Sequence, residues 1–431
     1  MAPTSTPLPT RLRSGLVLIA QLALLGALVG VACWPLNLVD RWQDLLLHLL
    51  PNYKAGAWSQ VQLLLACSPV LVMPLLLSLQ AGRWRDGAGS GIPQTMISIE
   101  DAAEAPALMA TRPVLKRLVI WSIASLSLFP LGREGPVVQV GAAVAYQLQR
   151  RWPRLLERLK ASNVMAVAAG AGLAGGFNTP LMGVIFVAEE LTGRFAPQLI
   201  WPGLVVCAVA AEISNLGGQP LFSLGLVQAD LLEASQLLWG ALMGVICGMA
   251  GGLFAWLLLR ASRWLTPRVR QQPWRWGLLL GGLLTGLALL SGGASGGDGE
   301  ALMSWLLSNP DAHQGTLITL VARLLGPVLA LGAGIPGGLI DPAFAIGAVL
   351  GDLVGRFSQH SVFGVTFGMT AALAGATQLP AMSLVFALHM AGDQQLLPGV
   401  AMAAVIGSYV GRLWMHKPVY HALTDLMHNR D

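Results

Sequence analysis

The chain has 431 residues, of which 55% are hydrophobic and only 11% are charged. Soluble domains carry about 25% charged residues, so this composition excludes a soluble globular protein, and its hydrophobicity also excludes a disordered one. The formal net charge of +5 comes from 26 Lys and Arg residues against 21 Asp and Glu residues. Transmembrane β-strands would alternate apolar and polar residues, whereas this sequence is apolar over long stretches. We therefore expect an all-α polytopic membrane protein.

Long apolar runs predict membrane helices along most of the chain. The first run follows Arg11 and Arg13 and is too long for the apolar core of a signal peptide, so we interpret it as a retained helix. Three other segments, 118–148, 163–191 and 334–391, are interrupted by Gly and Pro. Because lipid cannot satisfy free backbone groups, we expect these segments to be buried in protein or to line a cavity. The uninterrupted runs are 15–35, 61–80, 196–216, 236–260, 276–291, 316–333 and 396–414.

The basic residues gather between the apolar runs, with clusters at 150–160 and 260–275. This pattern predicts that these loops and the N-terminus lie in the cytoplasm. We expect an integral, multi-pass protein of the bacterial inner membrane and no nucleic-acid partner. The four cysteines lie far apart and form no CxxC pair, so neither a disulfide nor a thiolate metal site is expected.

An internal repeat is visible in the glycines and prolines. The spacing Gly-x3-Pro-x4-Gly begins at Gly132 and again at Gly338, 206 residues later. At the same offset 87–91 matches 293–297, and at an offset of 200 the segment 173–186 matches 373–386. Repeated halves with broken helices in corresponding positions are typical of transporters, which bind their substrate between the halves. We predict one integrated membrane domain of two related, inverted halves. The predicted parts are an N-terminal segment with the first membrane helix (1–60), a first half (61–216) and a second half (217–431).

Three glycine-rich breaks begin at Gly89, Gly132 and Gly338, and each ends in a proline four residues later. Proline favours the first position of a helix, so each break predicts a helix that begins inside the membrane. A helix N-terminus presents free N–H groups and about half a positive charge. Several converging N-termini would bind an anion, weakly enough to release it. The alternative is that these glycines only allow close helix packing, as expected for Gly248-x3-Gly252 and Gly282-x3-Gly286. Spacing alone does not decide between the two.

The combination of motifs resembles the CLC family of chloride channels and chloride/proton exchangers. The motifs are GSGIP at residues 89–93, GREGP at 132–136, the GxxxP element at 338–342, Glu189-Glu190 after Phe186, and KPVY at 417–420. They occur in the family's order and span roughly residues 80 to 425. The resemblance implies the family's fold of broken, tilted helices and a homodimer.

The resemblance also implies the site residues. It assigns the hydroxyls of Ser90 and Tyr420 to a central anion, and the backbone N–H groups of Leu339 and Ile340 to the same ion. Glu134 matches a gating glutamate that occupies the anion's position and leaves it when protonated, and Glu190 matches an internal glutamate that passes protons to and from the cytoplasm. The remaining candidates at the anion site lie in the same motifs and are Gly89, Gly91, Ile92, Arg133, Gly135 and Gly338.

The two glutamates are functional candidates on physical grounds as well, because a carboxylate within a membrane segment is costly. The alternative for Glu134 is an ion pair with Arg133. Neighbouring helical residues point about 100° apart, so the two need not meet. The same geometry means that Glu189 and Glu190 cannot face the same way, so one of them is expected to be structural.

Two residues depart from the family pattern. Ile340 stands where the family commonly has Phe, which keeps the N–H group but removes the ring. Asp341 stands where a small neutral residue is usual. An aspartate there can cap its own helix, using an N–H group meant for the ion and adding a negative charge, so these positions bear on anion selectivity.

The sequence thus predicts a transporter that exchanges chloride-like anions for protons, in membrane lipid, with no cofactor and no enzymatic activity. A passive voltage- or proton-gated chloride channel is the alternative. Glu190 favours exchange, because a pore needs no internal proton acceptor. A fluoride/proton exchanger is less favoured because Ser90 is present. Ser295, in a GxSxG pattern, raises the possibility of an intramembrane hydrolase, but that pattern needs a preceding strand, and an apolar helical run stands there instead.

Overall fold

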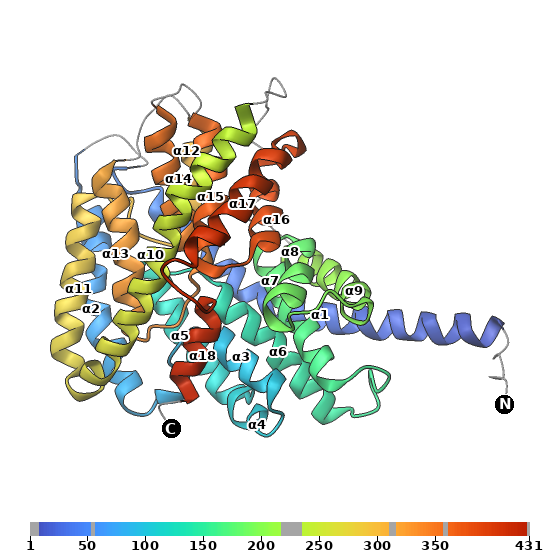
Figure 1. The fold of residues 1–431 in the computed structure, drawn as a ribbon. Helices are drawn as coiled ribbons and strands as arrows, with labels where there is room; N and C mark the ends of the chain where they lie inside the picture. Colours follow the sequence, from blue (N-terminus) through green and yellow to red (C-terminus); the bar gives the residue numbers. More distant parts are fainter. Residues whose placement is uncertain (1–7, 53–56, 217–234, 310–315, 357–360, 429–431) are drawn as a thin grey trace.

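The computed structural model describes residues 8–52, 57–216, 235–309, 316–356 and 361–428 (Figure 1). Within these ranges the chain forms helices joined by turns, with no strand and one isolated antiparallel bridge. The all-α fold expected from the composition is confirmed. Residues 217–234, where the predicted boundary between the halves falls, lie outside the described ranges, as do residues 1–7.

The helices differ widely in length, from the 4 residues of α4 to the 40 residues of α1. They are α1 (Leu8–Leu47), α2 (Gln60–Ala81), α3 (Ile92–Glu100), α4 (Ala105–Leu108), α5 (Thr111–Leu126), α6 (Glu134–Arg151), α7 (Ala161–Phe177), α8 (Pro180–Phe186), α9 (Pro197–Ser214), α10 (Ser235–Gln271), α11 (Pro273–Leu290), α12 (Glu300–Ser308), α13 (Leu317–Gly332), α14 (Ile340–Gly355), α15 (Ser361–Thr377), α16 (Pro380–Ala391), α17 (Leu397–Gly411) and α18 (Val419–His428). Short helical turns cover Arg85–Gly87, Val187–Leu191 and Gln394–Leu396.

Every uninterrupted apolar run corresponds to a helix. Within the described ranges five helices are long and apolar enough to cross a membrane: α1, α2, α9, α10 and α11. Helices α1 and α10 extend well beyond the runs that predicted them. Along α10 the guanidinium groups of Arg260 and Arg268 lie over the rings of Trp256 and Trp264. Such cation–π contacts are favourable. The interrupted segments form shorter helices, and most residues of α6, α7 and α14 are buried, as expected.

The helices repeat in order along the chain. Helices α5 and α6 correspond to α13 and α14 at an offset of 206, and α7, α8 and α9 correspond to α15, α16 and α17 at an offset of 200. The six-residue slip falls in the loop between α6 and α7. One detail of the sequence alignment is wrong: α3 corresponds to α12 at an offset of 208. The helix-capping Gly91 therefore matches Gly299, which has the same left-handed backbone, rather than Gly297.

The N-terminal helix belongs with the first set of helices. Helix α1 packs on α7 and α9 in the way that α10 packs on α15 and α17. We propose that α1 is the counterpart of α10, so that the first half begins before residue 61 and includes the N-terminal segment that the sequence set apart.

The two sets of helices meet at the motifs that revealed the repeat. The N–H of Gly132 donates to the carbonyl of Gly338 at 3.1 Å, and the N–H of Gly338 donates to the carbonyl of Gly132 at 2.8 Å. This bridge is antiparallel, so the matching segments run in opposite directions where they touch, as expected for an inverted repeat.

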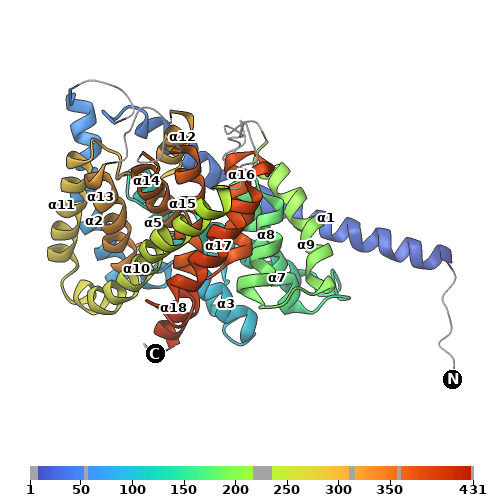
Figure 2. The ribbon, with the colours of Figure 1, turned by 45° about the horizontal axis from the view of Figure 1, so that its top comes forward.

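Helix packing depends on glycine, though not everywhere the motifs suggested. A Cβ on Gly248 or Gly252 would press against Gly407 or Gly411 of α17, whereas Gly282 faces open space, so only the first predicted packing motif is correct. Two other glycines of α11, Gly277 and Gly281, let α2 approach closely at its two prolines. Figures 1 and 2 show α2 and α11 side by side at one edge of the molecule. Their outer leucines are exposed, as a lipid-facing surface requires.

Candidate functional site

The N-termini of α3, α6 and α14 converge in the interior. A Cβ on Gly135 would lie 2.1 Å from the carbonyl oxygen of Ser90, and a Cβ on Gly91 would lie 2.4 Å from the carbonyl oxygen of Gly135. Only glycine allows the first turns of α3 and α6 to approach so closely. Helices α6 and α14 begin at Glu134 and Ile340, two residues before the predicted prolines, so each proline still falls within the first turn, where its missing N–H is harmless.

Glu134 places its carboxylate at the N-terminus of α14. Its side chain is fully buried, and its Oε1 accepts a hydrogen bond of 2.6 Å from the backbone N–H of Asp341. The space for this carboxylate comes from two glycines: a Cβ on Gly338 would lie 1.1 Å from Oε2, and a Cβ on Gly132 would lie 2.1 Å from it. The glutamate therefore occupies the position of an anion at a helix N-terminus.

The two hydroxyls assigned to the anion lie nearby. The hydroxyls of Ser90 and Tyr420 are both buried, and neither has a hydrogen bond to another described residue. Ser90 Oγ lies against the start of α6 at Gly135, and the Tyr420 hydroxyl is close to the N–H of Leu339 and interacts electrostatically with Glu134. Buried hydroxyls without a partner are uncommon, and together these two can donate to a buried anion.

Other predicted residues have backbone N–H groups that are already bonded within the protein, so they stabilise the site rather than donate to an anion. The N–H of Gly89 donates to Gly334, that of Gly91 donates to the side chain of Gln94, and that of Gly338 forms the bridge to Gly132. Ile92 and Ile340 are fully buried in the first turns of α3 and α14.

Arg133 does not pair with Glu134. Its guanidinium forms salt bridges with Asp40 of α1 and Glu300 of α12, and it lies over the ring of Phe177. One carboxylate oxygen each from Asp40, Asp298 and Glu300 lies within 4.8 Å of the others. Arg133 supplies the positive charge in this cluster of acids. The sequence did not predict the cluster, because Asp40 is far from Arg133 in the chain.

The prediction that Asp341 could cap its own helix is wrong. Helix α14 has no side-chain cap, and neither oxygen of Asp341 has a hydrogen-bond partner among the described residues. The backbone N–H of Asp341 instead serves Glu134. The extra carboxyl is therefore a second, separate acid beside the gate candidate.

The neighbouring glutamates in the turn after α8, Val187–Leu191, face different ways, as expected. Glu189 accepts from the backbone N–H groups of Ala381 and Met382, at 3.1 and 2.8 Å, and so caps α16. Glu190 lies in a π-helical turn, a feature frequent at functional sites. Its carboxylate is 1% exposed and lies 3.3 Å from Nδ1 of His421, which is 44% exposed. Sequence reasoning missed His421, although it directly follows Tyr420.

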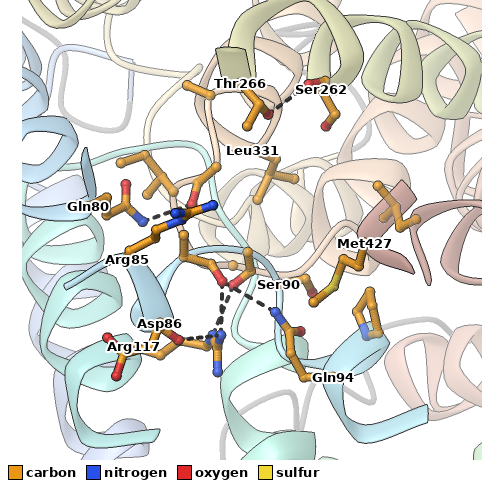
Figure 3. A pocket seen from close by; sticks show the side chains of 18 of the residues that line it. Gln80, Arg85, Asp86, Ser90, Gln94, Arg117, Ser262, Thr266, Leu331 and Met427 are labelled. Atoms are coloured by element: carbon orange, nitrogen blue, oxygen red, sulfur yellow. Dashed lines mark hydrogen bonds between the residues drawn. The ribbon is translucent and has the colours of Figure 1, made fainter. Parts of the chain in front are cut away.

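A cavity of about 740 Å³ leads to this region from the end of the molecule where α18 lies (Figure 3). Its wall includes Ser90 and Leu339, so it reaches the anion-site candidates. The wall also carries the basic residues Arg83, Arg85, Lys116, Arg117 and Arg270 against one acid, Asp86. A cavity lined mainly by positive charge raises the local concentration of anions.

Arg117 shapes the inner part of this cavity. Its side chain is buried and donates to the carbonyls of Asp86, Ala88 and Gly89, at 3.2, 2.9 and 3.0 Å, and to the side chain of Gln139 on α6. Figure 3 shows Arg117 bonded to the loop beside Ser90. Arg117 thereby ties the Ser90 loop to α6.

The hydrolase alternative finds no support in the loop around Ser295. Helix α11, not a strand, precedes this serine in the described structure. The loop forms turns, and the N–H of Ser295 donates to Ser291.

Broken helices, a repeated architecture and a buried acid at converging N-termini define a polytopic membrane transport protein. Residues 70–412 match the family described as voltage gated chloride channel. The protein of Yersinia pseudotuberculosis serotype IB (strain PB1/+) named H(+)/Cl(-) exchange transporter ClcA is 30% identical over 400 residues, covering 85% of this chain and 82% of that protein. The chain therefore belongs to the voltage-gated chloride channel, or CLC, family.

Other relatives differ in activity and origin. The Salmonella typhimurium (strain LT2) protein named voltage-gated ClC-type chloride channel ClcB is 30% identical over 301 residues, covering 67% of this chain and 70% of that protein. The solved structure of a slow cyanobacterial Cl−/H+ antiporter superposes with a TM-score of 0.76 at 22% identity, covering 95% of this chain and 98% of that one. This likeness shows the shared fold.

Proposed function

We propose that this protein is a secondary active transporter that exchanges chloride-like anions for protons across a membrane. The observation that carries the proposal is the carboxylate of Glu134, held by the N–H of Asp341 at the start of α14. An anion bound there would compete with Glu134, and protonation would release the glutamate from the positive end of the helix. One position thus serves the anion and the proton in turn.

The surrounding residues have complementary roles in this proposal. The anion next to Glu134 accepts hydrogen bonds from the hydroxyls of Ser90 and Tyr420 and from the N–H groups of Leu339 and Ile340. Glu190 delivers protons from the cytoplasmic side, and the basic cavity attracts anions to the same side. We also propose that the protein lies in the bacterial inner membrane with a cytoplasmic N-terminus, acts as a homodimer and is not an enzyme.

The proposal can be tested in proteoliposomes that contain the purified protein and a pH indicator. A chloride gradient should drive proton movement against the proton gradient, because the two ions alternate at one site. The reversal potential under combined chloride and pH gradients gives the coupling. Chloride flux without any proton movement would overturn the exchange proposal.

A chloride channel is the second candidate, favoured by the named activity of the Salmonella relative. The same measurement separates the two, since a channel's reversal potential follows the chloride gradient alone. Replacing chloride by fluoride or nitrate in the assay tests the anion selectivity, which Ile340 and Asp341 are expected to affect.

His421 gives the exchange proposal a specific pH dependence. The carboxylate of Glu190 raises the pKa of His421, which lies on α18 outside the membrane-spanning helices. If His421 passes protons to Glu190, coupled transport should slow as the internal pH rises through this raised pKa, where the imidazole loses its proton. His421→Gln should flatten that dependence, measured as initial proton flux against internal pH.

His428 lies on the same helix, and Nδ1 of its ring lies 3.2 Å from the carbonyl oxygen of Thr424 rather than beside a carboxylate. His428→Gln is therefore a matched control and should keep the pH profile. An unchanged profile in His421→Gln would show that protons reach Glu190 by another path.

A further inference from the structure

Asp341 is a buried acid with no role in the exchange described so far. Its side chain is fully buried, and both carboxyl oxygens lack a hydrogen-bond partner in the part of the chain that the structure describes. An unpaired carboxylate in such a place is strongly disfavoured unless it takes up a proton. Its own backbone N–H donates to the carboxylate of Glu134, so the carboxylate of Glu134 lies at the turn of α14 that carries Asp341.

The charges around Asp341 are mostly negative. It interacts electrostatically with Glu134 of α6, Asp298 of the loop before α12, Arg133, and Asp40 of α1. The cation in this set, Arg133, is already paired with Asp40 and with Glu300 of α12. The acids in this set therefore outnumber the cation, so several neighbouring carboxyl groups are available to pass a proton on.

The acids continue from this cluster along α1 to the surface. Asp40 lies in the cluster with Asp298 and Glu300. Asp44, one turn further along α1, interacts electrostatically with Asp298 and lies 3.3 Å from Nδ1 of His48, and Asp44 and His48 are 45% and 55% exposed. Helix α12, where this cluster lies, is at the opposite end of the molecule from α18 (Figures 1 and 2).

We propose that Asp341 exchanges protons directly with Glu134 and begins a proton route through Asp298, Asp40 and Asp44 to the surface at His48. The proposal rests on the proposed exchange function. In the transfer step a proton leaves the Asp341 carboxyl for the Glu134 carboxylate, and Asp341 is reprotonated from the acids behind it.

The test compares Asp341→Asn with the wild type in proteoliposomes, measuring chloride flux and proton flux separately at several pH values on the α12 side. Asparagine keeps the shape but cannot transfer a proton. A positioned acid contributes about a hundredfold or more to a proton transfer, so proton flux should fall at least about tenfold and by more than chloride flux does. The ratio of protons to chloride should fall accordingly.

Two further variants keep the test decisive. His48→Gln lies at the exposed end of the route, where folding is not at risk, and should weaken the dependence of proton flux on the pH of that side. Asp352→Asn removes a buried acid of the same helix that pairs with Arg356 away from the cluster, and should leave the coupling ratio unchanged.

The outcomes separate this inference from the function on which it rests. A wild type that moves no protons would overturn both. A coupled wild type whose ratio and pH profile survive in Asp341→Asn and in His48→Gln would overturn the route alone. Loss of proton flux in Asp341→Asn together with a weaker pH profile in His48→Gln would support it.

Discussion

Glu134→Gln is expected to convert coupled exchange into passive anion flux. Glutamine is close in shape to a protonated glutamate, but it carries no negative charge to hold at the N-terminus of α14 and no proton to transfer. The backbone N–H of Asp341, which now serves Glu134, becomes available to the transported anion. In proteoliposomes we expect chloride flux to persist, proton movement to vanish, and the reversal potential to follow chloride alone.

A second variant moves the gate candidate without removing its acid. Gly338→Ala would place a Cβ 1.1 Å from Oε2 of Glu134, so the carboxylate must leave its present position. We expect weaker coupling than in the wild type, with proton flux reduced but not abolished because the acid is still present. Gly282→Ala, where a Cβ meets nothing within 4 Å, is the control for a glycine substitution in a membrane helix.

Full coupling in Glu134→Gln would show that this carboxylate is not the shared proton and anion gate.

The sequence predicted the parts of this site that depend on local chemistry. The Gly-x3-Pro spacing at Gly132 and Gly338 located two helix N-termini to within two residues, and Glu134 lies there as expected. Repetition of the same spacing predicted that the halves would be related, and the bridge between these glycines shows where they meet. Such signals are readable because backbone conformation and helix capping are set by neighbouring residues.

Other features depend on residues distant in the chain and were therefore missed or misjudged. Arg133 was a candidate to bind the anion, but its guanidinium forms salt bridges with Asp40 and Glu300, which lie on two other helices. Asp341 offered a possible cap for α14, but its N–H donates to a glutamate from the other half, and its carboxyl interacts electrostatically with Asp298 and Asp40. The contact of Glu190 with His421 joins helices from opposite halves. No spacing along the chain reports which side chains such a fold brings together.

Glu190→Gln is expected to abolish proton coupling while anion flux continues. Glu190 is almost fully buried, and its carboxylate contacts the partly exposed His421 of α18, so it connects the interior to the surface at that end of the molecule. Without an ionisable group there, protons cannot reach Glu134 from that side, yet Ser90, Tyr420 and the start of α14 remain to bind the anion. The measurement is the reversal potential under opposed chloride and pH gradients, which should shift from a coupled value to that of chloride alone.

The neighbouring Glu189 supplies the matched control, because the same substitution one residue away has a different physical consequence. Its carboxylate accepts two backbone N–H groups at the start of α16, and loss of a helix cap costs about 1 kcal/mol of stability. Glu189→Gln should therefore lower the thermal stability of the protein and leave the coupling ratio intact. If coupling instead failed in Glu189→Gln and survived in Glu190→Gln, the roles of the two glutamates would be exchanged, and the path through His421 would lose its acceptor.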